Sequence, residues 1–176
     1  MVLPELVTPR LRLRPLTLDD VDRLHALWTD PGVRRYLWDD LVISRDRALE
    51  TVEASIHSAE SVGAGMWTLW PRQEDVLVGF CGLRRAGPEP IIELLYGLAP
   101  QFWGRGLATE ASQAVLAYAF QFHLTDVVYA CTDAPNTASI RVMERLGMSR
   151  RPDREGLVCY SIRSGEEAPC GDRSGD

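Results

Sequence analysis

The chain has 176 residues, with 19 basic and 25 acidic side chains and a formal net charge of −6 at pH 7. All 19 basic residues are arginine. The absence of lysine excludes P-loop nucleotide hydrolysis, protein-kinase chemistry and Schiff-base catalysis, each of which depends on a lysine side chain. The negative charge argues against a large nucleic-acid footprint. It suits either a cationic, amine-bearing partner or solubility alone.

The cysteines and histidines are scattered, with no CxxC pair and no histidine at ligand spacing. We therefore expect no metal site, and we expect reduced thiols at Cys81, Cys131, Cys159 and Cys170. The first residues lack the basic and apolar regions of a signal peptide. No apolar run approaches the roughly 18 residues that cross a membrane. The sequence predicts a cytoplasmic protein without a membrane or nucleic-acid partner.

The N-terminal part predicts one strand and two helices. Leucines alternate with arginines over residues 11–16, which is typical of a half-exposed strand. Thr17 then begins a helix that Asp30-Pro31-Gly32 ends. An irregular aromatic stretch over residues 36–40 follows. Ser44 is the expected N-cap of a second helix, which runs to about Val62.

The rest of the chain predicts a group of strands and then alternating helices and strands. The expected strands are 66–70, 76–84, 91–98, 127–132 and 157–163. The expected connections between the first three of these are 72–75 and 86–90. Helices are expected from about 107 to 122 and over 136–146. This order predicts an α+β domain over residues 1–163, followed by a disordered tail over 164–176.

Residues 91–108 carry the main chemical signal. A buried strand leads into Gly104-Arg105-Gly106, which opens a long amphipathic helix. Accessible backbone N–H groups and the positive end of a helix dipole suit a pyrophosphate. The dinucleotide fingerprint G-x-G-x-x-G is met only at its first two glycines, because Thr109 takes the third place. A glycine-rich turn without a ligand is the other alternative.

Three segments occur in order over residues 8–148. They are Thr8-Pro-Arg-Leu-Arg-Leu-Arg-Pro-Leu with Asp30-Pro-Gly-Val, then Trp103-Gly-Arg-Gly-Leu-Ala within residues 93–110, and Asn136-Thr-Ala-Ser139 with Glu144-Arg-Leu-Gly-Met148. Together they resemble the GNAT N-acetyltransferase superfamily, and more narrowly the branch that contains the ribosomal-protein N-terminal-alanine acetyltransferases. The second segment resembles its acyl-CoA loop, [QR]-x-x-G-x-[GA].

The resemblance implies an α+β GNAT fold. A mostly antiparallel seven-stranded sheet, flanked by about four helices, would splay between strands 91–98 and 127–132. Acetyl-CoA, the implied acetyl donor, would lie in this opening, with its pantetheine paired along one strand edge. The residues expected to contact it are Leu95, Tyr96, Leu98, Trp103, Gly104, Arg105, Gly106, Leu107, Ala108, Thr109, Asn136 and Ser139.

Two residues are candidates for proton transfer. Glu93, the only acid in its strand, is the candidate general base, acting through water, or else an exposed solubility residue. The resemblance places Ser139 where the departing CoA sulfur is protonated; the alternative is a helix serine bonded to its own backbone. Asn136 is either a plain helix cap or a cap that also holds the pantetheine.

The implied function is direct transfer of an acetyl group to a primary amine, without a covalent acyl-enzyme. The acceptor is a small molecule or a protein N-terminus, and the protein a monomer or homodimer. Residues expected at the acceptor wall are Tyr36, Trp38, Asp39 and Asp40, where two carboxylates can attract a cationic amine or simply form a solvated turn. Leu95 stands at a position that is commonly glycine in the family, and its side chain would narrow the space beside the thioester. The alternative function is a catalytically weak acyl-CoA-binding regulatory module.

Overall fold

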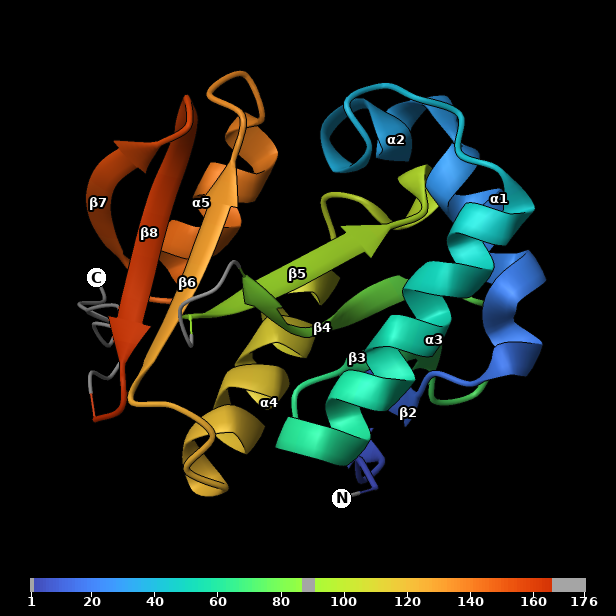
Figure 1. Ribbon diagram of the computed structural model, residues 1–176, viewed down its shortest axis with the longest axis horizontal. Helices are drawn as coiled ribbons and strands as arrows, with labels where there is room; N and C mark the ends of the chain where they lie inside the picture. Colours follow the sequence, from blue (N-terminus) through green and yellow to red (C-terminus); the bar gives the residue numbers. More distant parts are fainter. Residues whose placement is uncertain (1, 87–90, 166–176) are drawn as a thin grey trace, which may run out of the picture.

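The computed structural model describes residues 2–86 and 91–165, which form an open sheet covered by helices on both faces (Figure 1). The strand order is β1-β2-β3-β4-β5-β6-β8-β7. The strands are β1 (Leu6–Val7), β2 (Leu11–Pro15), β3 (Met66–Pro71), β4 (Gly79–Ala86), β5 (Ile91–Leu98), β6 (Val127–Thr132), β7 (Ser149–Arg154) and β8 (Leu157–Arg163). The helices are α1 (Val21–Thr29), α2 (Pro31–Leu37), α3 (Arg45–Val62), α4 (Leu107–Gln121) and α5 (Thr137–Arg145), with short 3₁₀ turns at Leu18–Asp20 and Pro100–Phe102.

Strands β5 and β6 form the only parallel pair among the described strands, and they separate early. Their register has only two partners, Ile92 with Val128 and Glu93 with Tyr129. Beyond Glu93 the strands diverge, as Figure 1 shows, with α5 beside β6 and α2 near the far end of β5. The backbone edge of β5 is therefore unpaired over its second half. This confirms the predicted splay and places an opening in the middle of the sheet.

Two hydrophobic clusters cover the two faces of the sheet. One packs α4 and α5 against the sheet, with Leu94, Val115 and Met143 at its centre. The other packs α1–α3 against the opposite face, with Trp28, Val52 and Phe80 at its centre. Because strand side chains alternate between faces, Leu94 and Leu98 join the first cluster while Leu95 contacts the second.

The predicted helix ends are present. Ser44 Oγ accepts a hydrogen bond from the backbone N–H of Arg47 at 3.1 Å, and Gly63 ends α3 with φ of 74°. Asn136 Oδ1 accepts from the N–H of Ser139 at 3.3 Å and begins α5. These residues satisfy backbone groups that a helix leaves without intrahelical partners.

Three elements were missed by the sequence analysis. Helix α2 lies in the stretch taken as irregular, where Asp30 accepts from the N–H of Gly32 at 2.8 Å and Pro31 occupies the first turn. The residues that end α1 therefore also begin α2. With strands β1 and β7 the sheet has eight strands, two more than the six segments predicted from the sequence pattern and one more than the resemblance implies. Strand β7 shows no apolar alternation because it is an exposed edge, with a register shift between Arg151 and Arg154.

The expectation of reduced thiols is wrong at two of the four cysteines. Cys131 and Cys159 are direct partners in the antiparallel register of β6 and β8, and they form a disulfide. Their separation of 28 residues along the sequence carried no sign of this pairing. Cys81 is free and buried, and burial raises the pKa of its thiol to about 12. Cys170, most of the predicted tail and the 87–90 connection lie outside the described residues.

Candidate functional site

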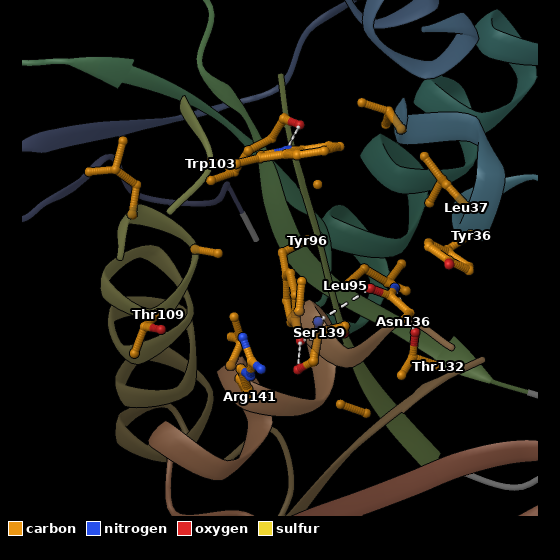
Figure 2. A pocket seen from close by; sticks show the side chains of 18 of the residues that line it. Tyr36, Leu37, Leu95, Tyr96, Trp103, Thr109, Thr132, Asn136, Ser139 and Arg141 are labelled. Atoms are coloured by element: carbon orange, nitrogen blue, oxygen red, sulfur yellow. Dashed lines mark hydrogen bonds between the residues drawn. The ribbon is translucent and has the colours of Figure 1, made fainter. Parts of the chain in front are cut away.

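The opening between β5 and β6 holds a cavity of about 440 Å³, which we call the β5–β6 cavity. A volume of a few hundred Å³ is typical of small-molecule sites. The lining comes from the second half of β5, the N-terminal end of α4, and α5 (Figure 2). Of the residues expected to contact the donor, all but Arg105 line it: Leu95, Tyr96, Leu98, Trp103, Gly104, Gly106, Leu107, Ala108, Thr109, Asn136 and Ser139.

A glycine turn forms one end of the cavity. Gly104 and Gly106 both have φ of 73°, a left-handed conformation that side chains other than glycine rarely adopt. A Cβ at Gly104 would meet nothing within 4 Å, and one at Gly106 would approach only Arg10 Nη2, at 3.7 Å. The turn therefore presents bare backbone to open space. Helix α4 begins at the next residue, so its first N–H groups have no intrahelical partners and face this end.

The glycine turn is tied to the N-terminal segment of the chain. Arg10 Nη1 donates to the backbone oxygen of Arg105 at 2.8 Å, and Arg10 Nε donates to Glu110 Oε2 at 2.6 Å. Glu110 also accepts from Thr8 Oγ1 at 2.6 Å and from the backbone N–H of Arg10 at 2.9 Å. Burial acts to raise the pKa of Glu110, but these hydrogen bonds outweigh it and hold the pKa below its ordinary value.

The polar groups around the turn fit an anionic ligand. The buried hydroxyl of Thr109 has no hydrogen-bond partner in the described part of the chain, although Thr109 lines the cavity. Arg141 and Arg145 bring two guanidinium groups to the opposite wall from α5. The sequence analysis named neither Arg141 nor Arg145 as a site residue. Only the position of α5 across the opening reveals them.

Two hydroxyl groups meet at the middle of the cavity. The Tyr96 hydroxyl lies 2.8 Å from Ser139 Oγ and donates to the backbone oxygen of Ser139 at 3.1 Å (Figure 2). Burial raises the pKa of Tyr96, and the bond to Ser139 opposes this only in part. The phenol therefore keeps its proton across neutral pH. The sequence analysis expected Tyr96 and Ser139 to contact the donor separately, and their separation of 43 residues gave no sign that the two hydroxyl groups meet.

Asn136 holds its place through both ends of its amide. Its Nδ2 donates to Thr132 Oγ1 at 2.9 Å while its Oδ1 caps α5. The residue also lines the β5–β6 cavity. It is therefore a helix cap at the cavity wall.

Glu93 lies on β5 opposite Arg84 of β4. Its Oε2 accepts from Arg84 Nε at 3.0 Å and lies 2.9 Å from Arg84 Nη2. The Glu93 side chain is only 13% exposed, so it is not a freely solvated residue. Alternation along the strand puts it on the same face as Leu95. Glu93 is absent from the described lining of the β5–β6 cavity.

A second cavity of about 320 Å³ lies on the face covered by α1–α3. Leu37 and Leu95 line both cavities, so the two spaces meet at these side chains. Of the residues expected at an acceptor wall, Tyr36 lines the β5–β6 cavity and Trp38 lines the second one. Asp39 and Asp40 are absent from the described lining of both, and Asp40 lies 3.5 Å from Arg34 Nη2.

Trp103 covers the outer end of the β5–β6 cavity. Its Nε1 donates to the backbone oxygen of Leu98 at 2.7 Å. The ring packs so closely on Gly32 of α2 that a Cβ at Gly32 would lie 2.9 Å from the ring edge. Trp103 thus joins the glycine turn to α2.

Among the described residues, no three or more His, Cys, Asp or Glu side chains are grouped so that they could hold a metal ion. In the same part of the chain, no helix is both long and apolar enough to cross a membrane.

Comparison with known proteins identifies the family. The model of the acetyltransferase (GNAT) domain matches residues 10–149. The uncharacterized N-acetyltransferase p20 of Bacillus licheniformis is 29% identical over 158 residues, which cover 87% of this chain and 84% of that protein. The spermidine N(1)-acetyltransferase of Escherichia coli (strain K12) is 23% identical over 79% of this chain and 73% of that protein.

A solved structure shares the fold. RimL, a ribosomal α-N-protein acetyltransferase crystallised with coenzyme A, superposes with a TM-score of 0.76 over 93% of this chain and 98% of that chain, at 19% identity. The mixed sheet and its splay are therefore those of the GNAT fold. Because the family model covers most of the chain, the protein is an acetyltransferase of the GNAT family.

Proposed function

We propose that the protein transfers the acetyl group of acetyl-CoA directly to a primary amine while both substrates are bound. The observation that carries this proposal is the meeting of two cavities at Leu37 and Leu95, next to the Tyr96–Ser139 hydroxyl pair. One cavity offers an anion-binding helix end and the other an apolar chamber. A donor and an acceptor can thus approach one point from two faces of β5.

The residues of the glycine turn would hold the donor. Acetyl-CoA supplies the acetyl group as a thioester, so transfer replaces a C–S bond by a C–N bond, removes a proton from the amine and delivers one to the sulfur. The N–H groups at the start of α4 and the guanidinium groups of Arg141 and Arg145 suit its phosphates. The unpaired edge of β5 suits the amide groups of its pantetheine. The free Thr109 hydroxyl is a further donor for this end.

Ser139, held in place by Tyr96, would deliver the proton to the sulfur. Ser139 Oγ lies at the cavity wall, and the protonated Tyr96 phenol is its hydrogen-bond partner at 2.8 Å. The serine can give its proton to the sulfur and take one back from water, while the phenol keeps its own proton and orients the serine hydroxyl. A covalent acetyl-cysteine is not favoured, because Cys131, a cysteine of the described cavity lining, is bonded to Cys159.

Glu93 would accept the proton from the amine. Its carboxylate lies on the face of β5 that leads to the second cavity, two residues from Leu95. Since Glu93 does not line the described cavities, a water molecule must connect the carboxylate and the amine. Arg84 holds one carboxylate oxygen and so fixes the orientation of the other.

The test follows CoA release with a panel of amines. We expect Ser139→Ala to lower kcat about 100-fold and Tyr96→Phe about tenfold, typical of lost proton transfer. Thr137→Ala is the matched control, because Thr137 is an exposed hydroxyl on the same helix. Acetyl-CoA binding without transfer to any amine would contradict the proposal and favour the regulatory module. An undiminished rate in both variants would remove the hydroxyl pair from the mechanism.

A further inference from the structure

The second cavity has a composition of its own. It is formed by side chains from α1–α3 and β3–β5, and we call it the indole cavity after Trp28 and Trp38. The lining residues are Trp28, Leu37, Trp38, Thr51, Ala54, Ser55, Ser58, Met66, Phe80, Leu83, Arg84, Arg85 and Leu95. Its volume suits a small organic group.

The charges of the indole cavity do not suit a polycation. Its described lining contains no carboxylate, and its charged members are Arg84 and Arg85. Glu93 is already bound to Arg84, and Arg85 has no ion-pair partner among the described residues. A polyamine keeps at least one ammonium group when another amine reacts. That group would lie beside the exposed guanidinium groups of Arg84 and Arg85, and the repulsion between like charges is unfavourable.

Two residues that line the cavity carry a hydrogen-bond donor without a partner. The Nε1 atoms of Trp28 and Trp38 are buried, and within the described chain neither finds an acceptor. Trp28 is only 1% exposed. An indole N–H can only donate, and a buried donor without an acceptor costs free energy. A carbonyl or carboxylate oxygen on a bound molecule would recover that cost.

The walls around these donors are aromatic. Trp28 packs edge-on against Trp38, with ring centroids 5.9 Å apart, and against Phe80, at 5.8 Å. Such edge-to-face contacts also favour an aromatic ring on a ligand. The other three indoles of the chain are satisfied: Trp67 donates to the Pro4 oxygen, Trp70 to Thr68 Oγ1 and Trp103 to the Leu98 oxygen.

We propose that the acceptor of this enzyme is an α-aminoacyl group with an aromatic or large apolar side chain, and that the indole cavity binds it. This inference rests on the proposed acetyl transfer. The apolar walls take the side chain, the indole N–H groups of Trp28 and Trp38 take the carbonyl oxygen, and the amine faces Leu95. The same chemistry occurs in a free amino acid amide and in the first residue of a peptide.

The kinetic test compares amines that differ in one feature. Phenylalaninamide carries the ring and the carbonyl, phenethylamine lacks the carbonyl, glycinamide lacks the ring, and spermidine is the polycation. We expect kcat/KM for phenylalaninamide to exceed that of each other amine at least about tenfold, because buried donors reject a ligand without an acceptor. A tripeptide that begins with phenylalanine then distinguishes the sources: equal rates indicate a peptide N-terminus, and a preference for the amide indicates a small molecule.

The variant Trp38→Phe keeps an aromatic ring and removes one donor. It should lower kcat/KM for phenylalaninamide about tenfold and that for phenethylamine by less. Equal losses for both amines, or a preference for spermidine in the wild-type enzyme, would overturn the inference while leaving the acetyl transfer intact.

The indole N–H resonances give a readout that does not depend on activity. In a ¹⁵N-labelled protein, coenzyme A should shift the Trp103 signal, which Trp103→Phe assigns, because Trp103 lines the β5–β6 cavity. N-acetylphenylalaninamide should shift the indole N–H signals of Trp28 and Trp38, of which the second is identified by its loss in Trp38→Phe. The signals of Trp67 and Trp70 should stay in place. If coenzyme A shifts the Trp103 signal but N-acetylphenylalaninamide shifts neither the Trp28 nor the Trp38 signal, the inference about the acceptor is wrong while the proposed acetyl transfer stands. If coenzyme A shifts nothing and no amine is acetylated, the proposed function fails with it.

Discussion

The β5–β6 cavity and the indole cavity meet at the same two leucines but are built in different ways. The first takes its binding groups largely from backbone: the positive-φ turn at Gly104 and Gly106, the free end of α4 and the unpaired edge of β5. The second takes its groups from side chains on six helices and strands. A backbone site recognises a fixed ligand, whereas a side-chain site changes its ligand with each substitution. Under the proposed function, the first cavity would bind the shared donor and the second a specific acceptor.

The largest expected effect concerns the glycine turn. Gly106→Glu places a side chain and a negative charge at the anion-binding end of the β5–β6 cavity, in a left-handed conformation that suits glycine. We expect calorimetry to show no measurable binding of coenzyme A.

Gly156→Glu is the matched control for this change. Gly156 has φ of 83° with open space around its Cβ position, but it lies in the turn between β7 and β8. The Gly156→Glu variant should bind coenzyme A with the affinity of the wild type. Unchanged affinity in Gly106→Glu would remove the anion site, and with it the contrast between the two cavities.

The disulfide at the wall of the β5–β6 cavity is expected to stabilise the folded protein. Cys131 lines that cavity, and its bond to Cys159 closes a loop over a separation of 28 residues. A loop of this length should contribute about 3 kcal/mol to the free energy of unfolding. Urea denaturation with and without a reductant measures this difference. The double variant Cys131→Ser/Cys159→Ser should not respond to the reductant, and a wild-type protein equally indifferent to it would contradict the expectation.

Leu95 offers a way to alter the junction. Since it lines both cavities, Leu95→Ala should enlarge the space where they adjoin. We expect kcat/KM for phenylalaninamide relative to glycinamide to change about tenfold, as the loss of a few methylene groups in an apolar pocket does. Steady-state rates for the two amines measure the ratio. A ratio equal to that of the wild type would mean that Leu95 does not separate the two sites.

The smallest effect concerns the attachment of the glycine turn to the N-terminal segment. Because hydrogen bonds hold the pKa of Glu110 below its ordinary value of 4.5, its contribution to stability is present above that pH and is lost as the pH falls through the lowered pKa. Glu110→Gln should therefore lower the free energy of unfolding by about 1 kcal/mol at neutral pH.

This difference from the wild type should disappear in acid. Urea denaturation at neutral pH and at about pH 3 measures it. Glu53→Gln, on the exposed face of α3, is the control and should show little difference at either pH. A Glu110→Gln effect that persists unchanged in acid would assign the stabilisation to packing.

Much of the fold was predictable because local residues determine it. Ser44 marks the start of α3 through its side-chain cap, and Gly63 and Gly106 mark helix ends through a left-handed backbone conformation that few other residues adopt. Helix α2 was missed because Asp30-Pro31-Gly32 both ends one helix and begins the next. Strand β7 was missed because an exposed edge strand needs no apolar alternation. The disulfide was missed because it depends on the register of two strands that are not adjacent in sequence.

The two cavities also differ in how far local sequence determines them. The glycine turn lies in one segment, so its pattern predicts an anion site. The bond between Tyr96 and Ser139 and the placement of Arg141 depend on how α5 lies across the opening from β5. The indole cavity has no motif at all, because Trp28, Trp38 and Phe80 come together only through packing. Of these three residues the sequence analysis named only Trp38, together with the acidic turn at Asp39 and Asp40.

If the donor and acceptor bind together and react directly where the cavities adjoin at Leu37 and Leu95, the kinetics must be those of a ternary complex. Initial rates are measured while acetyl-CoA and the best amine of the panel are both varied. We expect intersecting double-reciprocal lines. Parallel lines, the sign of a covalent acetyl-enzyme, would contradict this expectation.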